Sequence, residues 1–118
     1  MRPRILRLGV VRVSGRSMTP TLRDGDLLLI AYAARPRLGS LVLARLPPQP
    51  DGTPRPVAVK RLTGRDPADP ARWWLERDNP REGVDSWLVG SVGADAVLGR
   101  VVTRIWPRPG RPRTALPR

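Results

Sequence analysis

Cysteine and histidine are absent from the 118 residues of this chain. Their absence excludes a disulfide framework, a cysteine nucleophile and a Ser-His catalytic triad. It also argues against a structural zinc site, because such sites are built from thiolate and imidazole ligands. If the chain is a hydrolase, three chemistries remain: a Ser or Thr nucleophile with a lysine base, a pair of carboxylates, or a metal held by carboxylates.

Long apolar runs and aromatic residues are also scarce. The longest apolar stretch, residues 27–34, is far below the ~20 residues that a helix needs to cross a bilayer. The first residues contain no hydrophobic region as long as that of a signal peptide. We therefore expect no integral membrane segment and a cytoplasmic location. Four Trp, one Tyr and no Phe leave Leu, Val, Ile and Ala to build the core.

Acidic residues are few: 10 Asp and Glu stand against 22 Lys and Arg, which gives a net charge of +12. A basic domain that binds nucleic acid would have such a charge. The arginines are dispersed, however, and the tryptophans do not alternate with basic residues as they do in single-strand binders. The leading interpretation therefore has no nucleic-acid partner, and a basic β-domain that binds nucleic acid is kept as an alternative.

Short apolar runs separated by Gly- and Pro-rich turns predict an all-β domain, folded as coiled antiparallel sheets or a partial barrel with very little helix. We expect strands at residues 8–13, 27–33, 41–46, 57–62, 72–76 and 99–106, and an extended segment at 87–92. Residues 64–71 read as a loop, and 94–98 as one helical turn. One domain is expected over residues 1–106, followed by a disordered, basic Pro/Arg-rich tail at 107–118.

Lys60 is the only lysine among the 22 cationic residues. Arginine stays charged at any accessible pH, whereas a lysine becomes a base once burial lowers its pKa. On a strand, Ala58, Lys60 and Leu62 share one face, and apolar residues on the other face favour burial on both sides. The alternative is a lysine whose amine extends to water from a strand end. The absence of any other lysine favours the functional interpretation.

Ser17 lies in the turn of the segment VRVSGRSMTPTLRDGDLLLI, residues 11–30. A serine in such a turn is often only a turn former. Here it follows an expected strand and a glycine, and Pro20 lies three residues further on. A turn of this kind exposes the hydroxyl and leaves the serine N–H free to donate to an oxyanion. The hydroxyl still requires a base nearby.

Four segments in order resemble the sequence boxes of type I signal peptidases and their relatives. They are SGRSMTPTL (14–22), RDGDLL (23–28), VKRL (59–62) and the run from Asp78-Asn79-Pro80 to Asp85-Ser86, Gly90 and Val92. Each box alone is modestly specific, but four in the family's order are strongly so. Together they span most of the chain, from about Val11 to Trp106.

The resemblance implies a Ser-Lys peptidase with an all-β fold that acts on a protein substrate. In it, Ser17 is the nucleophile and supplies one oxyanion N–H, and Lys60 is the general base. Support residues are implied at Asp78, Asn79, Asp85 and Ser86, for which loop capping without a catalytic part is the alternative. Gly15, Met18 and Pro20 would shape the turn or the substrate cleft. No metal and no cofactor are expected, and the oligomeric state is left undetermined.

Four positions depart from the family pattern. Gly15 stands where some members have a serine that contributes to the oxyanion hole, so a second donor must come from elsewhere or be missing. Gly83 stands where many members have a serine in contact with the lysine. Trp87 replaces an arginine of the signal peptidases, and Arg77 replaces their usual glycine.

Gly83, the missing arginine at position 87, the short chain and the expected absence of an anchor make the sequence more similar to another branch. This is the maturation protease of nickel-dependent superoxide dismutase, which removes a short N-terminal extension from the dismutase precursor. We expect that activity, with signal-peptide processing as the alternative. A third possibility is an inactive relative or a self-cleaving regulator. Sixteen residues precede Ser17, which argues against self-cleavage upstream of the serine.

Overall fold

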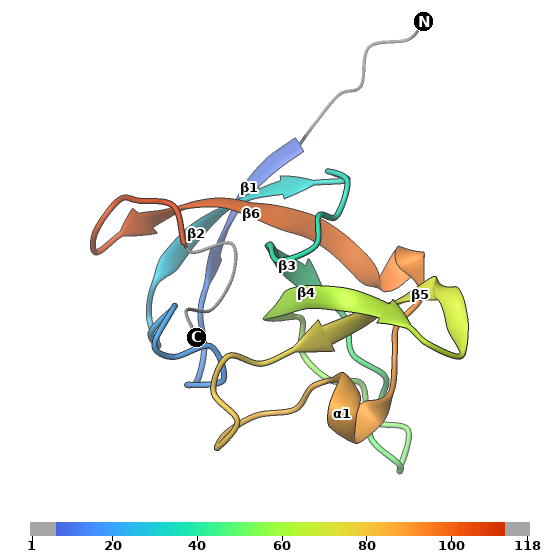
Figure 1. Ribbon diagram of the computed structural model, residues 1–118. Coiled ribbons are helices and arrows are strands. Elements are labelled where there is room, and N and C mark those ends of the chain that lie inside the picture. The colour runs from blue at the N-terminus through green and yellow to red at the C-terminus, as the bar shows by residue number, and fades with distance from the viewer. Residues whose placement is uncertain (1–6, 113–118) are drawn as a thin grey trace, which may run out of the picture.

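The computed structural model describes residues 7–112 (Figure 1). Its elements, in chain order, are β1 (Arg7–Arg12), β2 (Leu27–Tyr32), β3 (Leu41–Ala44), β4 (Ala58–Asp66), β5 (Asp69–Glu76), α1 (Ser86–Val89), η1 (Ala94–Ala96) and β6 (Val97–Trp106). Six strands and two very short helices confirm the predicted all-β class.

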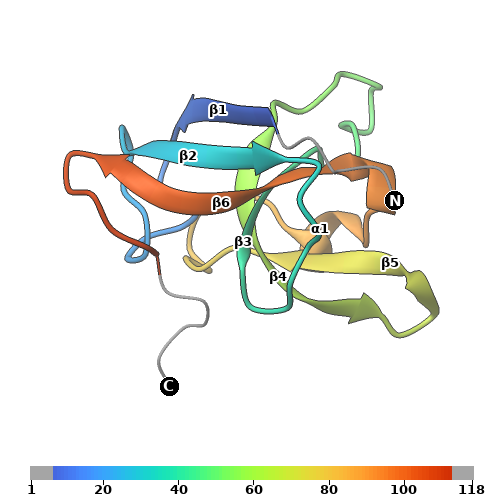
Figure 2. The same cartoon turned by 90° about the horizontal axis from the view of Figure 1, so that it is seen from above.

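The strands form one antiparallel sheet in the order β1-β2-β6-β3-β4-β5. The last strand, β6, lies between β2 and β3 and so joins the first part of the chain to the middle part. In Figure 2 the strands β1, β2 and β6 run side by side, with β3, β4 and β5 on the other side of β6. Strands β1 and β5 are the edges, so the sheet is coiled but not closed.

Strand β3 shows how the sheet builds its core. All four of its residues are buried. Since side chains alternate along a strand, Leu41 and Leu43 pack into one hydrophobic cluster and Val42 and Ala44 into another. The first cluster also holds residues of β2 and of the Ser17 turn, and the second holds residues of β4 and β5. Strand β4, next to β3, is therefore covered on both faces.

Two local predictions were wrong. Residues 64–71 are not a loop, because β4 and β5 continue into a tight hairpin in which Asp66 pairs with Asp69. The Gly and Pro residues that suggested a loop mark an irregularity in register at Gly64 and the turn itself. Residues 87–92 are not extended throughout: α1 begins at Ser86, where the Asp85 side chain caps its first turn by accepting from the Trp87 N–H. The expected helical turn is present as η1.

The predicted boundary between a domain at 1–106 and a tail at 107–118 stays a prediction, and residues 113–118 lie outside the described part. Within the described part, Gly110 exchanges two backbone hydrogen bonds with Arg104, of 2.8 and 3.1 Å. Across residues 7–112 no helix has the length and apolar character needed to span a bilayer.

Candidate active site

Ser17 lies in the loop that connects β1 to β2. The base of this loop is closed by backbone hydrogen bonds from Val13 N–H to Asp26 O and from Gly25 N–H to Val13 O, both 2.8 Å. Met18 and Leu22 anchor it from below, because their side chains are buried in the first hydrophobic cluster. The loop therefore has a fixed shape although it contains no regular secondary structure.

Lys60 approaches Ser17 from β4. Its side chain is buried, with 3% of the residue's surface exposed, and its Nζ lies 2.9 Å from Ser17 Oγ. Burial lowers the pKa of the Lys60 amine; the Asp85 carboxylate acts in the opposite direction, and the Arg77 guanidinium lowers it further. A lysine with a lowered pKa carries more neutral amine near neutral pH, and only that form accepts a proton.

The Ser17 N–H is free to act as a donor. Within residues 7–112 it makes no hydrogen bond to another group of the protein. An unpaired N–H beside a nucleophile can bind the oxyanion that forms during acyl transfer. Gly15 supplies no side-chain donor, and a Cβ placed there would have nothing within 4 Å.

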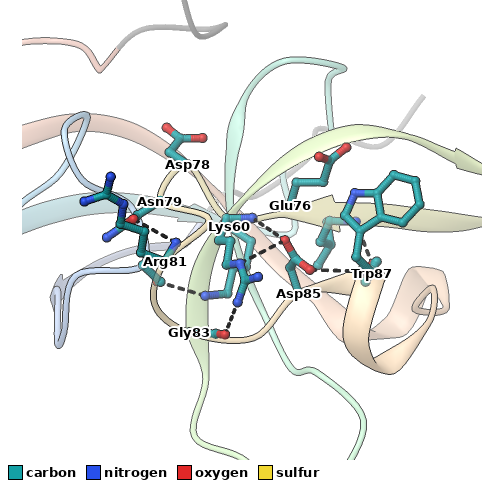
Figure 3. A network of polar contacts seen from close by, with 12 residues as sticks. Lys60, Glu76, Asp78, Asn79, Arg81, Gly83, Asp85 and Trp87 are labelled. Atoms are coloured by element: carbon teal, nitrogen blue, oxygen red, sulfur yellow. Dashed lines mark hydrogen bonds and ion pairs between the residues drawn. The ribbon is translucent and has the colours of Figure 1, made fainter.

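Asp78 and Asn79, labelled in Figure 3, both bond to the loop that carries Ser17. Asp78 accepts two bonds from Arg61, of 2.9 and 2.7 Å, and one of 2.5 Å from Thr21 Oγ1. The Asn79 backbone N–H donates to Ser17 O over 2.8 Å. The Asn79 side-chain amide donates to Arg16 O over 2.9 Å. Both residues thus hold the loop that carries the serine.

Asp85 and Ser86 lie on the other side of Lys60. One Asp85 carboxylate oxygen caps α1, and the other accepts from the Arg77 N–H over 3.1 Å and lies 3.6 Å from Arg77 Nε. Ser86 is buried, and its hydroxyl accepts from the Leu75 N–H over 2.9 Å. Asp85 therefore both caps a helix and acts on the Lys60 pKa, while Ser86 ties α1 to β5.

A groove with a volume of about 510 Å³ runs past the two central residues. Ser17, Lys60, Gly15 and Met18 line it, whereas Pro20 lies in the turn next to it. Its apolar walls come largely from valines: Val11, Val13, Val57, Val59 and Val84. Such a groove fits an extended apolar segment of another polypeptide. Among the described residues no cluster of His, Cys, Asp or Glu could hold a metal ion.

Sequence reasoning missed two contacts of the segment at 77–83. Gly83 has a φ of +90°, and a Cβ at this position would lie 2.5 Å from Ser17 Cβ. A serine there, as in many signal peptidases, has no room in this arrangement. Arg77 is the residue that pairs with Asp85, whereas Trp87 packs edge-on against Trp74. The arginine at position 77, where the family pattern has a glycine, was the one feature of the sequence that could have indicated this pairing.

Comparisons with known proteins identify the family. The sequence profile of the Peptidase S24-like family matches residues 6–102. The mitochondrial inner membrane protease subunit 1 of Mus musculus is 28% identical over 116 residues, which cover 84% of this chain and 70% of that protein. The same subunit from Xenopus tropicalis is 29% identical over 119 residues, covering 83% and 69%. These relatives support a peptidase of the signal-peptidase-like kind.

Proposed function

Because the chain belongs to the Peptidase S24-like family, we propose that it is a serine endopeptidase in which Ser17 is the nucleophile and Lys60 the general base. One observation carries this proposal: the only lysine of the chain is buried with its Nζ 2.9 Å from a serine hydroxyl that lines a groove. A hydroxyl needs a base at that range to become a nucleophile.

The reaction follows from this geometry. The neutral Lys60 amine takes the Ser17 hydroxyl proton as Oγ attacks the scissile carbonyl, and the Ser17 N–H binds the oxyanion of the tetrahedral intermediate. The Lys60 ammonium then gives its proton to the leaving amine, which departs and leaves an acyl-enzyme. Water, deprotonated by Lys60, attacks the ester, and Ser17 recovers its proton as the carboxylic acid leaves.

The proposed substrate is a precursor protein that carries an N-terminal leader. The two relatives reported above are named as subunits of a mitochondrial inner membrane protease, and neither is named for dismutase maturation. They therefore favour leader processing of the signal-peptidase kind over removal of an extension from nickel-dependent superoxide dismutase. The dismutase precursor remains the second candidate substrate, and a cytoplasmic location stays a prediction.

The test is cleavage of two purified precursors, one with a signal-peptide-like leader and one of the nickel-dependent dismutase, with products identified by mass spectrometry. Ser17→Ala and Lys60→Arg are each expected to lower kcat/KM by at least ~10²-fold, since the nucleophile or the base is lost. The matched control is Ser40→Ala, because among residues 7–112 the Ser40 hydroxyl bonds only to Arg37 O. Normal cleavage by Lys60→Arg would refute the lysine base.

A further inference from the structure

Arg77 follows β5 directly and contacts two points of the loop that leads to α1. Its Nη1 donates to Gly83 O, and its Nε lies 3.6 Å from Asp85 Oδ2. Its backbone N–H donates to the same Asp85 oxygen over 3.1 Å. The Arg77 side chain therefore joins the end of β5 to two groups. One is the segment that runs past Ser17, and the other is the Asp85 carboxylate, which acts on the pKa of Lys60.

The contact with Gly83 reaches the nucleophile. The Gly83 backbone packs so closely on Ser17 that a Cβ would lie 2.5 Å from Ser17 Cβ. A bond that fixes the Gly83 carbonyl thereby also fixes the wall against which Ser17 rests. In Figure 3, Gly83 and Asp85 both lie below Lys60, and dashed lines end on each of them.

The contact with Asp85 reaches the base. Asp85 raises the pKa of Lys60 and Arg77 lowers it, while burial is the largest influence and also lowers it. Four further charged residues line the same groove and are exposed or half-buried: Arg12, Arg16 and Arg55 from other segments, and Glu82 from the same loop. Water and salt screen such groups, and none of them contributes to the shift of Lys60.

We propose that Arg77 is a positioning residue that neutralises Asp85 beside Lys60 and holds Gly83 against Ser17. Loss of the Arg77 charge has two consequences of the same sign: a cation near Lys60 disappears, and Asp85 becomes an unpaired anion. Both favour the protonated amine, so the pKa of Lys60 rises in an Arg77 variant. The catalytic part of this proposal rests on the proposed function, in which Lys60 is the base.

Because Lys60 is the only lysine, protein labelled with ¹³C at lysine Cε gives one side-chain resonance whose pH titration reports this amine alone. Arg77→Gln and Arg77→Met are expected to move the titration midpoint to higher pH. The matched control is Arg81→Gln, on the same loop and exposed, which leaves the midpoint unchanged. An unchanged midpoint in both Arg77 variants, or an equal shift in Arg81→Gln, would overturn the proposal. Failure of both Arg77 variants to fold would also overturn the proposal, since Arg77 would then be required for folding.

Cleavage kinetics supply the second measurement. In Arg77→Gln, kcat near neutral pH is expected to fall several-fold with little change in KM, and the loss is expected to shrink as pH rises. Arg77→Lys, which keeps a charge, is expected to recover most of kcat. A loss that is equal at every pH would contradict the role at Lys60. If wild-type protein cleaves no precursor, the proposed function fails, whereas the lysine titration still decides the role of Arg77.

Discussion

Lys60 and Arg61 are neighbours on β4, carry the same formal charge and are each 3% exposed, yet their surroundings differ. Arg61 makes two hydrogen bonds to the Asp78 carboxylate, of 2.9 and 2.7 Å, and a third to Gly39 O. Lys60 instead meets a neutral hydroxyl at 2.9 Å, and no carboxylate of residues 7–112 lies within ion-pair distance of it.

The difference teaches that burial alone does not make a base. Arg61 stays charged at any accessible pH, and its bonds to the Asp78 carboxylate and to Gly39 O make it part of the scaffold. A buried amine without such a partner loses part of its preference for the proton. The two are neighbours on the strand; Arg61 holds Asp78, which accepts from Thr21 of the serine loop, while Lys60 reaches the serine itself.

The largest effect on stability is expected when Arg61, the buried cation that belongs to the scaffold, is replaced. Arg61→Met leaves the Asp78 carboxylate buried without its main partner, and the free energy of unfolding is expected to fall by about 3–5 kcal/mol. Urea unfolding measures it. The double variant Arg61→Met/Asp78→Leu, which removes both charges, is the control and is expected to lose less. A loss under ~1 kcal/mol for Arg61→Met would mean that Arg61 contributes no more to the free energy of unfolding than a surface cation does.

The strand pattern was predictable from the sequence because apolar runs and Gly/Pro turns are local signals. Lys60 could also be identified from the sequence, since a single lysine among arginines is noticed without a structure. The pairing of β6 between β2 and β3 was not, because it depends on contacts between distant segments. The hairpin at Asp66 and Asp69 was missed because its turn residues resembled a longer loop.

Within the candidate site, the family boxes named segments that lie together in the structure, but they did not predict the contacts between them. The φ of Gly83 and its approach to Ser17 depend on how the loop after β5 folds back, which no spacing encodes. The role of Arg77 likewise depends on its reach to Gly83 and Asp85. Substitutions that alter one contact at a time can therefore test the contacts of Gly83 and of Arg77 separately.

An intermediate effect is expected at Gly83, where the serine can be displaced while Arg61 is left in place. Gly83→Ala and Gly52→Ala both put a side chain at a φ near +90°, which costs about 1–2 kcal/mol of unfolding free energy. Only Gly83→Ala also meets Ser17, because Gly52 has nothing within 4 Å. We expect both to lose stability and only Gly83→Ala to lose most of its kcat. Equal activity in the two variants would refute the contact.

The smallest effect is expected from Lys60→Met, which removes the other buried cation. The folded-state pKa of Lys60 lies below its ordinary value of 10.5, so between these two values the unfolded chain binds more protons. Wild-type stability therefore rises with pH across this window.

Lys60→Met lacks this pH dependence, so we expect it to be more stable than wild type by about 0.5–2 kcal/mol at neutral pH, as when a functional site loses a group that destabilises the fold. The gain is expected to shrink as pH approaches 10.5, whereas Arg81→Met, which removes a permanently charged and exposed cation, shows no such trend. Urea unfolding at several pH values measures both; a gain that grows with pH would mean that the fold stabilises the Lys60 ammonium.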